Sequence, residues 1–238
     1  MTQRTPLPAL PDPADFAHVD VWIFDLDNTL YPPEAALFAQ IETRMTAYVT
    51  RQLGVTEAEA ARLRDTYWRD HGTTLSGLMT HHGIDPTAYL DDVHDIDFSG
   101  LTPDPDLADA IRALPGTRII HTNADVRYAA RVLAARDLDV FDAVYGIEEA
   151  GFHPKPDAAS FAAIIAAHGV DPTRAAFFED DPRNLDMPYA LGMRTVLVGQ
   201  GRHGPELLAD DHAHGDHVLY QTHDLTAFLR GVRPPQTA

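Results

Sequence analysis

The sequence predicts an α/β protein in which a doubly wound parallel sheet carries an inserted helical cap. The first observation is that short apolar runs alternate with helical stretches from Pro103 onward, which is typical of a parallel sheet covered on both faces. The second is that residues 35–98 show helical periodicity and no strand pattern. Because this stretch interrupts the alternation directly after the first strand, we expect it to lie over the sheet edge.

The first strand is expected at Val21–Phe24, where four β-branched and aromatic residues indicate a strand buried on both faces. A helix follows, because apolar residues recur at helical spacing up to Gly54. Thr56 and Glu59 form a capping box for the next helix. The expected helices cover residues 35–53, 56–70, 74–82, 86–93, 104–114, 125–136, 157–168, 182–191 and 223–229. The later expected strands cover residues 118–121, 143–145, 175–178, 194–198 and 217–220.

These elements divide the chain into three parts. Residues 1–17 are proline-rich without an apolar period, so we expect a flexible N-terminal arm. Residues 18–34 and 99–232 form the expected Rossmann-like catalytic core, and residues 35–98 form the helical cap.

Composition limits the classes of partner. The chain of 238 residues carries 36 acidic residues against 18 Lys plus Arg, a formal net charge of -18, which disfavours a nucleic-acid polymer or a membrane surface as partner. The absence of cysteine excludes disulfides, zinc-thiolate sites and thiol catalysis. No apolar run has the length of a membrane span, and the start of the chain lacks the pattern of a signal peptide. We expect a cytoplasmic monomer or homodimer that acts on a small molecule.

Two aspartates follow the first strand. Asp25 and Asp27 are two residues apart, so on extended backbone both carboxylates point to the same side. They lie at the carboxyl end of the strand, where open α/β sheets bind ligands. Three interpretations of the pair remain open: the aspartates cap the next helix, hold a structural divalent cation, or act as nucleophile and acid/base.

Other polar residues follow later strands and loops and can reach the same sheet edge. Singly, each has an ordinary explanation as a helix cap or a solvated loop residue. Their joint occurrence in this order favours a catalytic site. These residues are Thr122, Asn123, Lys155, Glu179 and Asp180.

A phosphate monoester is a substrate that would need all of these groups. Attack by the Asp25 carboxylate on phosphorus brings two negative groups together and therefore requires cations. Lys155 is one cation. Mg²⁺ is the other, held by Asp25, the main-chain carbonyl of Asp27 and a carboxylate of Glu179 or Asp180.

The remaining groups fit the rest of the reaction. The Thr122 hydroxyl and main-chain N–H groups near Leu26 and Asn123 can hold the phosphoryl oxygens, as can Lys155. Asp27 is then free to protonate the leaving oxygen and later to deprotonate the attacking water. The expected catalytic residues are therefore Asp25, Asp27, Thr122 and Lys155.

Four segments together resemble the motifs of the haloacid dehalogenase (HAD) superfamily of phosphatases. The helical stretch after the first of them resembles the C1 cap of that superfamily. Tyr31–Pro32 and residues 73–78 and 93–95 resemble its pyrimidine 5′-nucleotidase branch. The resemblance implies Mg²⁺-dependent hydrolysis of nucleoside monophosphates such as UMP and CMP. The four segments are Phe24–Leu30, Thr122–Asn123, Lys155–Pro156 and Phe178–Asp181.

Two departures from the family pattern matter. Dehalogenating members lack an acid at the position of Asp27, so its presence favours phosphoryl transfer. Where relatives often have Asp-Asp-Ser or Gly-Asp-Ser, this chain has three acids in a row. We assign Asp180 as a direct metal ligand and Glu179 as a ligand in the second shell or through water. Tyr31 and residues 73–79 are candidate substrate contacts.

Several assignments stay open from sequence alone. Asp181 either strengthens the metal site or caps the next helix, and Asn184 orients the loop or Lys155. The histidines within residues 203–217 are expected on a solvated surface, and His94 faces either substrate or solvent. Alternatives to a nucleotidase are a sugar-phosphate or phosphoglycolate phosphatase, a phosphomutase, or a non-enzymatic phospho-aspartate signalling or scaffold protein.

Overall fold

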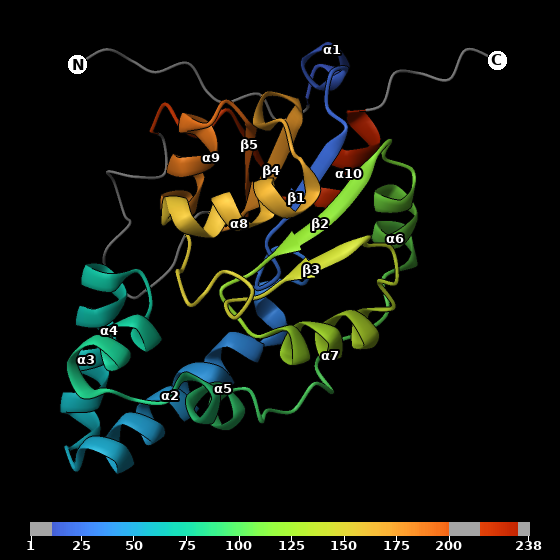
Figure 1. Ribbon diagram of the computed structural model, residues 1–238. Helices are drawn as coiled ribbons and strands as arrows, with labels where there is room; N and C mark the ends of the chain where they lie inside the picture. Colours follow the sequence, from blue (N-terminus) through green and yellow to red (C-terminus); the bar gives the residue numbers. More distant parts are fainter. Residues whose placement is uncertain (1–10, 200–214, 233–238) are drawn as a thin grey trace, which may run out of the picture.

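The protein is built on a six-stranded parallel sheet within residues 11–199 and 215–232, which the computed structural model describes (Figure 1). The strand order is β3-β2-β1-β4-β5-β6, so the chain starts at the centre and winds outward in both directions. The predicted doubly wound α/β fold is confirmed. The strands are β1 (Val21–Phe24), β2 (Thr117–His121), β3 (Ala143–Tyr145), β4 (Ala175–Glu179), β5 (Arg194–Val198) and β6 (Tyr220–Thr222).

Helices cover both faces of this sheet. Neighbouring residues of a strand point to opposite faces, so Trp22 and Phe24 pack on one side and Ile23 on the other. The first side is covered by α6 (Pro105–Arg112), α7 (Val126–Arg136) and α10 (Leu225–Gly231). The second is covered by α8 (Ala158–His168) and α9 (Asp186–Ala190), the latter preceded by a 3₁₀ turn at Pro182–Leu185. All strands of the sheet centre are therefore buried on both faces.

A block of four helices separates β1 from α6 and lies beyond the carboxyl ends of the central strands (Figure 1). Half of the expected capping box is present: the Thr56 hydroxyl accepts a hydrogen bond from the Glu59 N–H at 3.3 Å, whereas the Glu59 carboxylate bonds to Arg62. We call this set the helical block; it comprises α2 (Leu37–Leu53), α3 (Glu57–His71), α4 (Thr74–His82) and α5 (Pro86–Val93).

Two expectations near the ends of the chain are wrong. Within the described part of the predicted loose arm, Pro13–Phe16 forms the short helix α1, capped by Asp12. Phe16 is buried because its ring packs against Trp22 and Phe228, with ring centroids 6.2 and 5.8 Å apart. The last strand begins at Tyr220 rather than at residue 217, because the His217 carbonyl accepts from the side-chain hydroxyl of Thr195 in β5, and main-chain pairing with β5 starts only at Tyr220.

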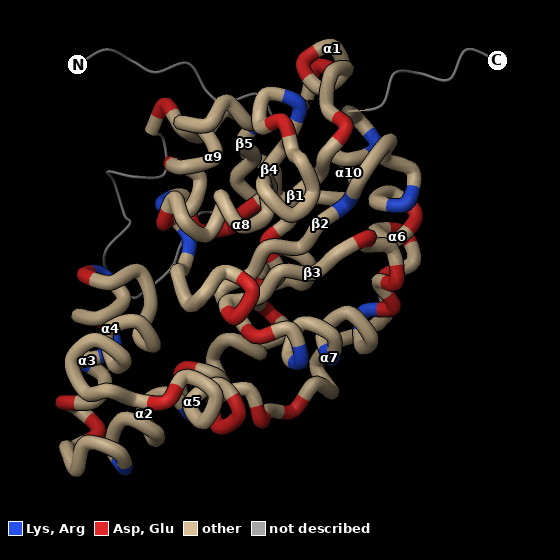
Figure 2. The backbone as a smooth tube through the Cα atoms, viewed as in Figure 1, with Lys and Arg blue, Asp and Glu red and all other residues tan. Residues whose placement is uncertain are grey.

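Charged residues are distributed over both the sheet region and the helical block. Figure 2 shows acidic positions on α5 and α6 and basic positions along α7, whose charged residues are all arginines. Ionisable side chains also join the two parts: Arg127 of α7 lies 2.6 Å from Asp91 of α5. Among the described residues, no helix is long and apolar enough to cross a membrane.

Candidate active site

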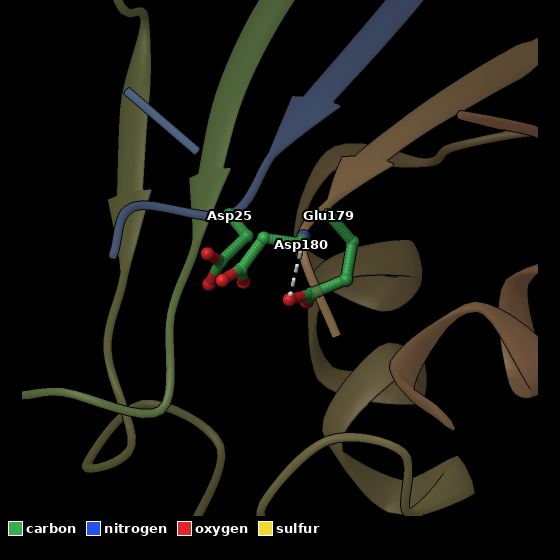
Figure 3. A group of neighbouring side chains, drawn as sticks. All are labelled: Asp25, Glu179 and Asp180. Carbon is green, nitrogen blue, oxygen red and sulfur yellow. Dashed lines mark hydrogen bonds between the residues drawn. The ribbon is translucent and has the colours of Figure 1, made fainter. Parts of the chain in front are cut away.

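The candidate site lies where β1 and β4 end side by side. These adjacent strands are the point from which the chain winds in opposite directions, which is where doubly wound sheets bind ligands. Asp25 directly follows β1, and its N–H donates to the Phe178 carbonyl of β4 at 2.8 Å. Glu179 ends β4 and Asp180 comes next, so the three carboxylates project from one sheet edge (Figure 3).

Lys155 joins two of these carboxylates. Its Nζ lies 2.6 Å from Asp25 Oδ1 and 2.7 Å from Glu179 Oε2, and the residue is only 1% exposed. Burial alone would lower the pKa of this ammonium, but the two carboxylates raise the pKa above its ordinary value, so the group stays charged. Lys155 is the only lysine in the chain, and every other basic position is an arginine. A compact ammonium is thus used where a planar guanidinium would need more room.

The carboxylates repel one another, which is the condition that a divalent cation relieves. Burial, with repulsion from Asp180 and Asp27, raises the pKa of Asp25 to about 6 although Lys155 opposes this shift. Burial and the nearby Asp25 likewise raise the pKa of Glu179 well above its ordinary value. Oxygens of Asp25, Glu179 and Asp180 all lie within 4.8 Å of one another. Such hard oxygen donors are the ligands that Mg²⁺ prefers, so these residues fit the expected ion.

Glu179 has both of its oxygens engaged by the protein. Oε2 contacts Lys155, and Oε1 accepts hydrogen bonds from the N–H groups of Asp180 and Asp181 at 3.2 and 3.1 Å. The side chain therefore fixes both the lysine and the loop that carries Asp180.

The two loops that carry Thr122 and Lys155 are bonded to each other. Asn123 Oδ1 accepts the Lys155 main-chain N–H at 2.8 Å, so this amide positions the lysine segment as well as lining the cavity. Thr122 is buried at the end of β2, and its hydroxyl accepts the Ala124 N–H at 3.0 Å. The cap of α7 is Asp125 rather than Thr122, which leaves the threonine hydroxyl able to donate toward the site.

Asp27 is held by two tyrosines. Its Oδ1 accepts hydrogen bonds from the Tyr31 hydroxyl at 2.5 Å and the Tyr128 hydroxyl at 2.7 Å. Burial raises the pKa of Asp27, and these two bonds partly offset that effect. Tyr31 is 2% exposed and does not line the cavity, so the expectation that it contacts substrate is corrected: it contacts Asp27. The Leu26 side chain is fully buried, and its carbonyl accepts from two N–H groups of the turn.

One residue of the acidic loop after β4, Asp181, caps the 3₁₀ turn that follows. Asp181 accepts the Arg183 N–H at 3.0 Å and pairs with the Arg183 guanidinium at 2.6 Å. Of the two interpretations left open for Asp181, capping matches these contacts. Arg183 also stacks on Trp68 of α3, 3.3 Å above the ring centroid, and so connects this loop to the helical block. Asn184 is buried and lines the cavity.

A cavity of about 490 Å³ connects these groups with the helical block. Its floor holds Asp25, Asp27, Thr122, Lys155 and Asp180, and its opposite wall is mainly apolar. The wall residues are Phe38, Ile41, Met45, Trp68, Leu75, Leu90 and Val93, with Arg64, Arg69 and Thr73 among them. One end of the cavity therefore suits an anion with its metal, and the other an organic group.

Sequence reasoning missed Tyr128, the second donor to Asp27, and the contacts of His94. His94 ends α5 and stacks on Tyr128, with ring centroids 4.3 Å apart, while its Nδ1 lies 2.5 Å from Asp125 Oδ2. The one feature of the sequence that could have pointed to Tyr128 is its position in the first turn of α7, the helix that follows Thr122. Most of the histidine-rich segment 203–217 lies outside the described residues; His217 pairs with Asp186 at 2.9 Å.

Comparison with known proteins gives one matching family and related proteins that cover most of the chain. Residues 19–192 match the family described as haloacid dehalogenase-like hydrolase. Phosphate metabolism protein 8 of Saccharomyces cerevisiae is 27% identical over 209 residues, which are 80% of this chain and 64% of that protein. The chain thus spans less than two thirds of that relative. Enolase-phosphatase E1 of Streptomyces avermitilis is 26% identical over 214 residues, covering 76% of this chain and 84% of that protein.

Solved structures show the same fold at lower identity. CbbY of Rhodobacter sphaeroides, crystallised with phosphate, superposes with a TM-score of 0.60 at 17% identity, over 89% of this chain and 96% of that one. A defluorinating L-2-haloacid dehalogenase superposes with a TM-score of 0.55 at 19% identity, over 91% of this chain and 96% of that one. The neighbours therefore include both phosphate-binding and dehalogenating proteins.

Proposed function

Because the chain belongs to the haloacid dehalogenase-like hydrolases, we propose that it is a Mg²⁺-dependent phosphomonoesterase with Asp25 as nucleophile. The observation that carries the proposal is the buried cluster at the sheet edge. Lys155 lies 2.6 Å from Asp25, the acids within 4.8 Å fit a divalent cation, and Asp27 is presented beside them. This set supplies a nucleophile, a cation and an acid/base in one cavity.

In the first step an Asp25 carboxylate oxygen bonds to phosphorus while the bond from phosphorus to the leaving oxygen breaks. Asp27, protonated, gives its proton to that leaving oxygen, so an alcohol departs and Asp25 carries the phosphoryl group. In the second step Asp27 takes a proton from water as the water oxygen bonds to phosphorus. The bond to Asp25 breaks, inorganic phosphate leaves, and both aspartates return to their starting forms.

The other residues hold charge. Lys155 stays cationic and faces the nucleophile, and the Thr122 hydroxyl with main-chain N–H groups near Leu26 and Asn123 would hold phosphoryl oxygens. Bound by Asp25, Asp180 and the Asp27 carbonyl, Mg²⁺ would supply the additional positive charge that a phosphoryl group needs. Glu179, with both oxygens already engaged, would act by fixing Lys155 and the Asp180 loop.

Asp27 favours phosphate esters over haloacids. A halide leaves as a stable anion without a proton, whereas an alcohol leaving from a phosphate ester needs one. The Asp27 carboxyl group would provide that proton. The name of the related Enolase-phosphatase E1 is consistent with such chemistry.

Pyrimidine nucleoside 5′-monophosphates are the proposed substrates. The resemblance of Tyr31–Pro32 and residues 73–78 to the pyrimidine nucleotidases supports this class. The cavity supports it as well, because an aromatic and aliphatic wall that includes Phe38 and Trp68 lies opposite the carboxylates and suits a planar base. The helical block would then select the substrate and exclude water when it closes.

The test is phosphate release from UMP, CMP, AMP, sugar phosphates and phosphoglycolate, and chloride release from L-2-chloropropionate, each with Mg²⁺ or with EDTA. We expect turnover that requires Mg²⁺ and is fastest with UMP or CMP. Turnover confined to sugar phosphates or phosphoglycolate would retain the phosphatase and reject the nucleotidase. Halide release without phosphate release would reject the phosphatase itself.

A further inference from the structure

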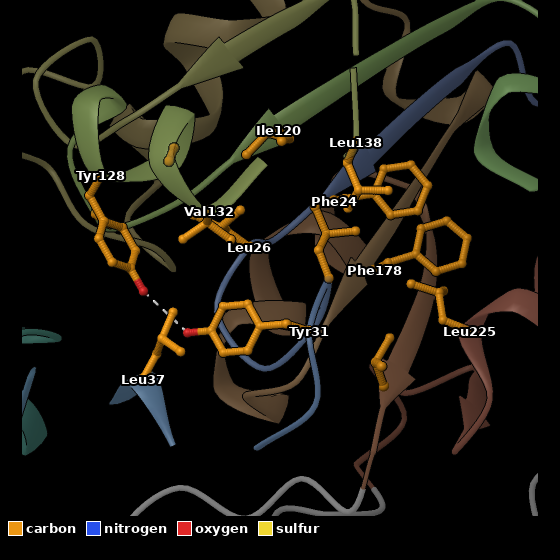
Figure 4. Packing of buried hydrophobic residues seen from close by; sticks show 14 of the residues in the cluster. Phe24, Leu26, Tyr31, Leu37, Ile120, Tyr128, Val132, Leu138, Phe178 and Leu225 are labelled. Carbon is orange, nitrogen blue, oxygen red and sulfur yellow. Dashed lines mark hydrogen bonds between the residues drawn. The ribbon is translucent and has the colours of Figure 1, made fainter. Parts of the chain in front are cut away.

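Two buried tyrosine hydroxyls donate hydrogen bonds to the same carboxylate oxygen of Asp27. Tyr31 and Tyr128 are 2% and 1% exposed, and both donate to Oδ1. Their hydroxyl oxygens lie 3.2 Å apart and face each other, as Figure 4 shows. The two tyrosines come from segments 97 residues apart, so the fold brings them together at this atom.

These hydroxyls have no role in packing. A phenylalanine would fill either apolar position, and a buried hydroxyl without a partner is destabilising. Burial, together with the adjacent Asp27 carboxylate, raises the pKa of both tyrosines, so each hydroxyl keeps its hydrogen and remains a donor. Because both bonds go to Oδ1, the other oxygen of Asp27 is the one that can be presented to the cavity.

We propose that Tyr31 and Tyr128 are positioning residues that hold the Asp27 carboxyl group toward the leaving oxygen of the substrate. The proposal rests on the proposed function, because it assumes that Asp27 is the acid/base of phosphoryl transfer. The tyrosines themselves do not touch the substrate. They fix the rotation of a short side chain whose remaining oxygen must reach the ester oxygen within hydrogen-bond distance.

A second layer of contacts fixes Tyr128. Asp125 caps α7 by accepting the Tyr128 N–H at 2.8 Å, and its other oxygen lies 2.5 Å from His94 Nδ1. The His94 ring lies nearly parallel to the Tyr128 ring, with an interplanar angle of 22°. Since His94 ends the last helix of the helical block, the support of Asp27 includes a residue from that block. The acid/base is thereby connected to the part of the molecule that would select the substrate.

The experiment compares two substrates that differ in their need for a proton. UMP has an alkoxide leaving group that must be protonated, whereas p-nitrophenyl phosphate releases a stabilised phenolate that does not. Full-length wild type, Tyr31→Phe, Tyr128→Phe and the double variant are assayed with saturating Mg²⁺. The value of kcat/KM reports the step in which Asp25 is phosphorylated.

We expect each single variant to lose about tenfold in kcat/KM for UMP, and the double variant about a hundredfold, within the range that general acids contribute. For p-nitrophenyl phosphate the loss should stay below about threefold, because that reaction needs no acid. Asp27→Asn should give the same selective pattern with a larger loss. The control is Tyr220→Phe, which removes a hydroxyl that donates to Asp15 away from the cavity, and should change neither rate.

The outcomes separate the two proposals. Equal losses for both substrates in the tyrosine variants would overturn the positioning role, since a general structural defect affects every substrate. If Tyr31→Phe and Tyr128→Phe kept the wild-type rates while Asp27→Asn lost activity selectively toward UMP, the positioning role would also be overturned. The proposed phosphatase function would then still stand. If wild type released phosphate from neither substrate, the proposed function would be wrong and the positioning role with it. The same result is expected for Tyr31→Phe and for Tyr128→Phe. If one of these variants fails to fold, the other still tests the positioning role.

Discussion

Replacing Lys155 by methionine removes the side-chain cation that, within residues 11–199 and 215–232, is bonded to both Asp25 and Glu179. Its Nζ lies 2.6 and 2.7 Å from these carboxylates, and all three side chains are buried. Removing one partner of a buried ion pair typically costs about 3–5 kcal/mol, because the other charge is left uncompensated. A domain of this size loses roughly 2–4 °C in Tm per kcal/mol, so Lys155→Met should unfold about 6–20 °C below wild type without Mg²⁺.

The same substitution should reduce turnover. An electrostatic group that faces the developing transition state is commonly worth about 10²–10³ in kcat, so we expect a loss in this range. In this variant the ammonium of Lys155 no longer opposes the effect of burial, so the pKa values of Asp25 and Glu179 rise further and Mg²⁺ becomes the cation that can keep these groups ionised. Mg²⁺ should therefore raise the Tm of Lys155→Met by more than it raises the Tm of wild type.

The measurements are thermal unfolding by circular dichroism with EDTA and with Mg²⁺, and phosphate release at saturating substrate. Arg112→Met is the control, because it removes an exposed pair with Asp109 and should leave Tm and turnover nearly unchanged. The reasoning would be refuted by a Lys155→Met variant within roughly 2 °C of wild type in EDTA. Turnover within about tenfold of wild type would refute the catalytic part alone.

Three further predictions concern single residues. Asp25→Asn should abolish phosphate release while its circular dichroism spectrum stays native, and near-normal turnover would exclude Asp25 as nucleophile. Mg²⁺ should raise the Tm of wild type but not of Asp180→Asn, and an equal rise in both would exclude Asp180 as a ligand. Burial holds the pKa of His121 well below its usual value, so the unfolded chain binds a proton that the native state refuses. The free energy of unfolding should therefore decrease as the pH falls below about 6.5, with a contribution from His121 of up to about 1.4 kcal/mol per pH unit. Urea unfolding at pH 7, 6 and 5 should show a less steep decrease in His121→Gln than in wild type. Equal pH dependence of the unfolding free energy in the two proteins would contradict this.

The sequence predicted the sheet and the core of the candidate site because both depend on local pattern. Val21–Phe24 is a short β-branched and aromatic run typical of a strand buried on both faces, and the polar residues after it mark the strand end. Once the strands are parallel, their carboxyl ends must share an edge, so Asp25 and Glu179 meet there. Lys155 reaches them from the loop after β3, which Asn123 holds in place.

The rest depends on contacts between distant segments. Nothing local distinguishes Tyr128 from other tyrosines in amphipathic helices, because its partner Asp27 is 101 residues away. The place of Tyr31 at the end of the first motif suggests a substrate contact, but its hydroxyl turns back to Asp27. Phe16 lies in a segment whose prolines suggested a loose arm, and only packing against Trp22 makes it part of the core.

A chain with a single lysine has a single side-chain amine, and here the fold encloses it. Amine-reactive esters require an unprotonated, accessible nitrogen, whereas Lys155 is charged and 1% exposed. Acylation of this side chain should therefore be blocked in the native protein. When the site opens, Lys155 can take up one acyl group. The intact mass of the protein after a timed pulse of reagent would then give the fraction of molecules in which the site had opened. The absence of cysteine leaves thiol chemistry free for a second, independently placed probe.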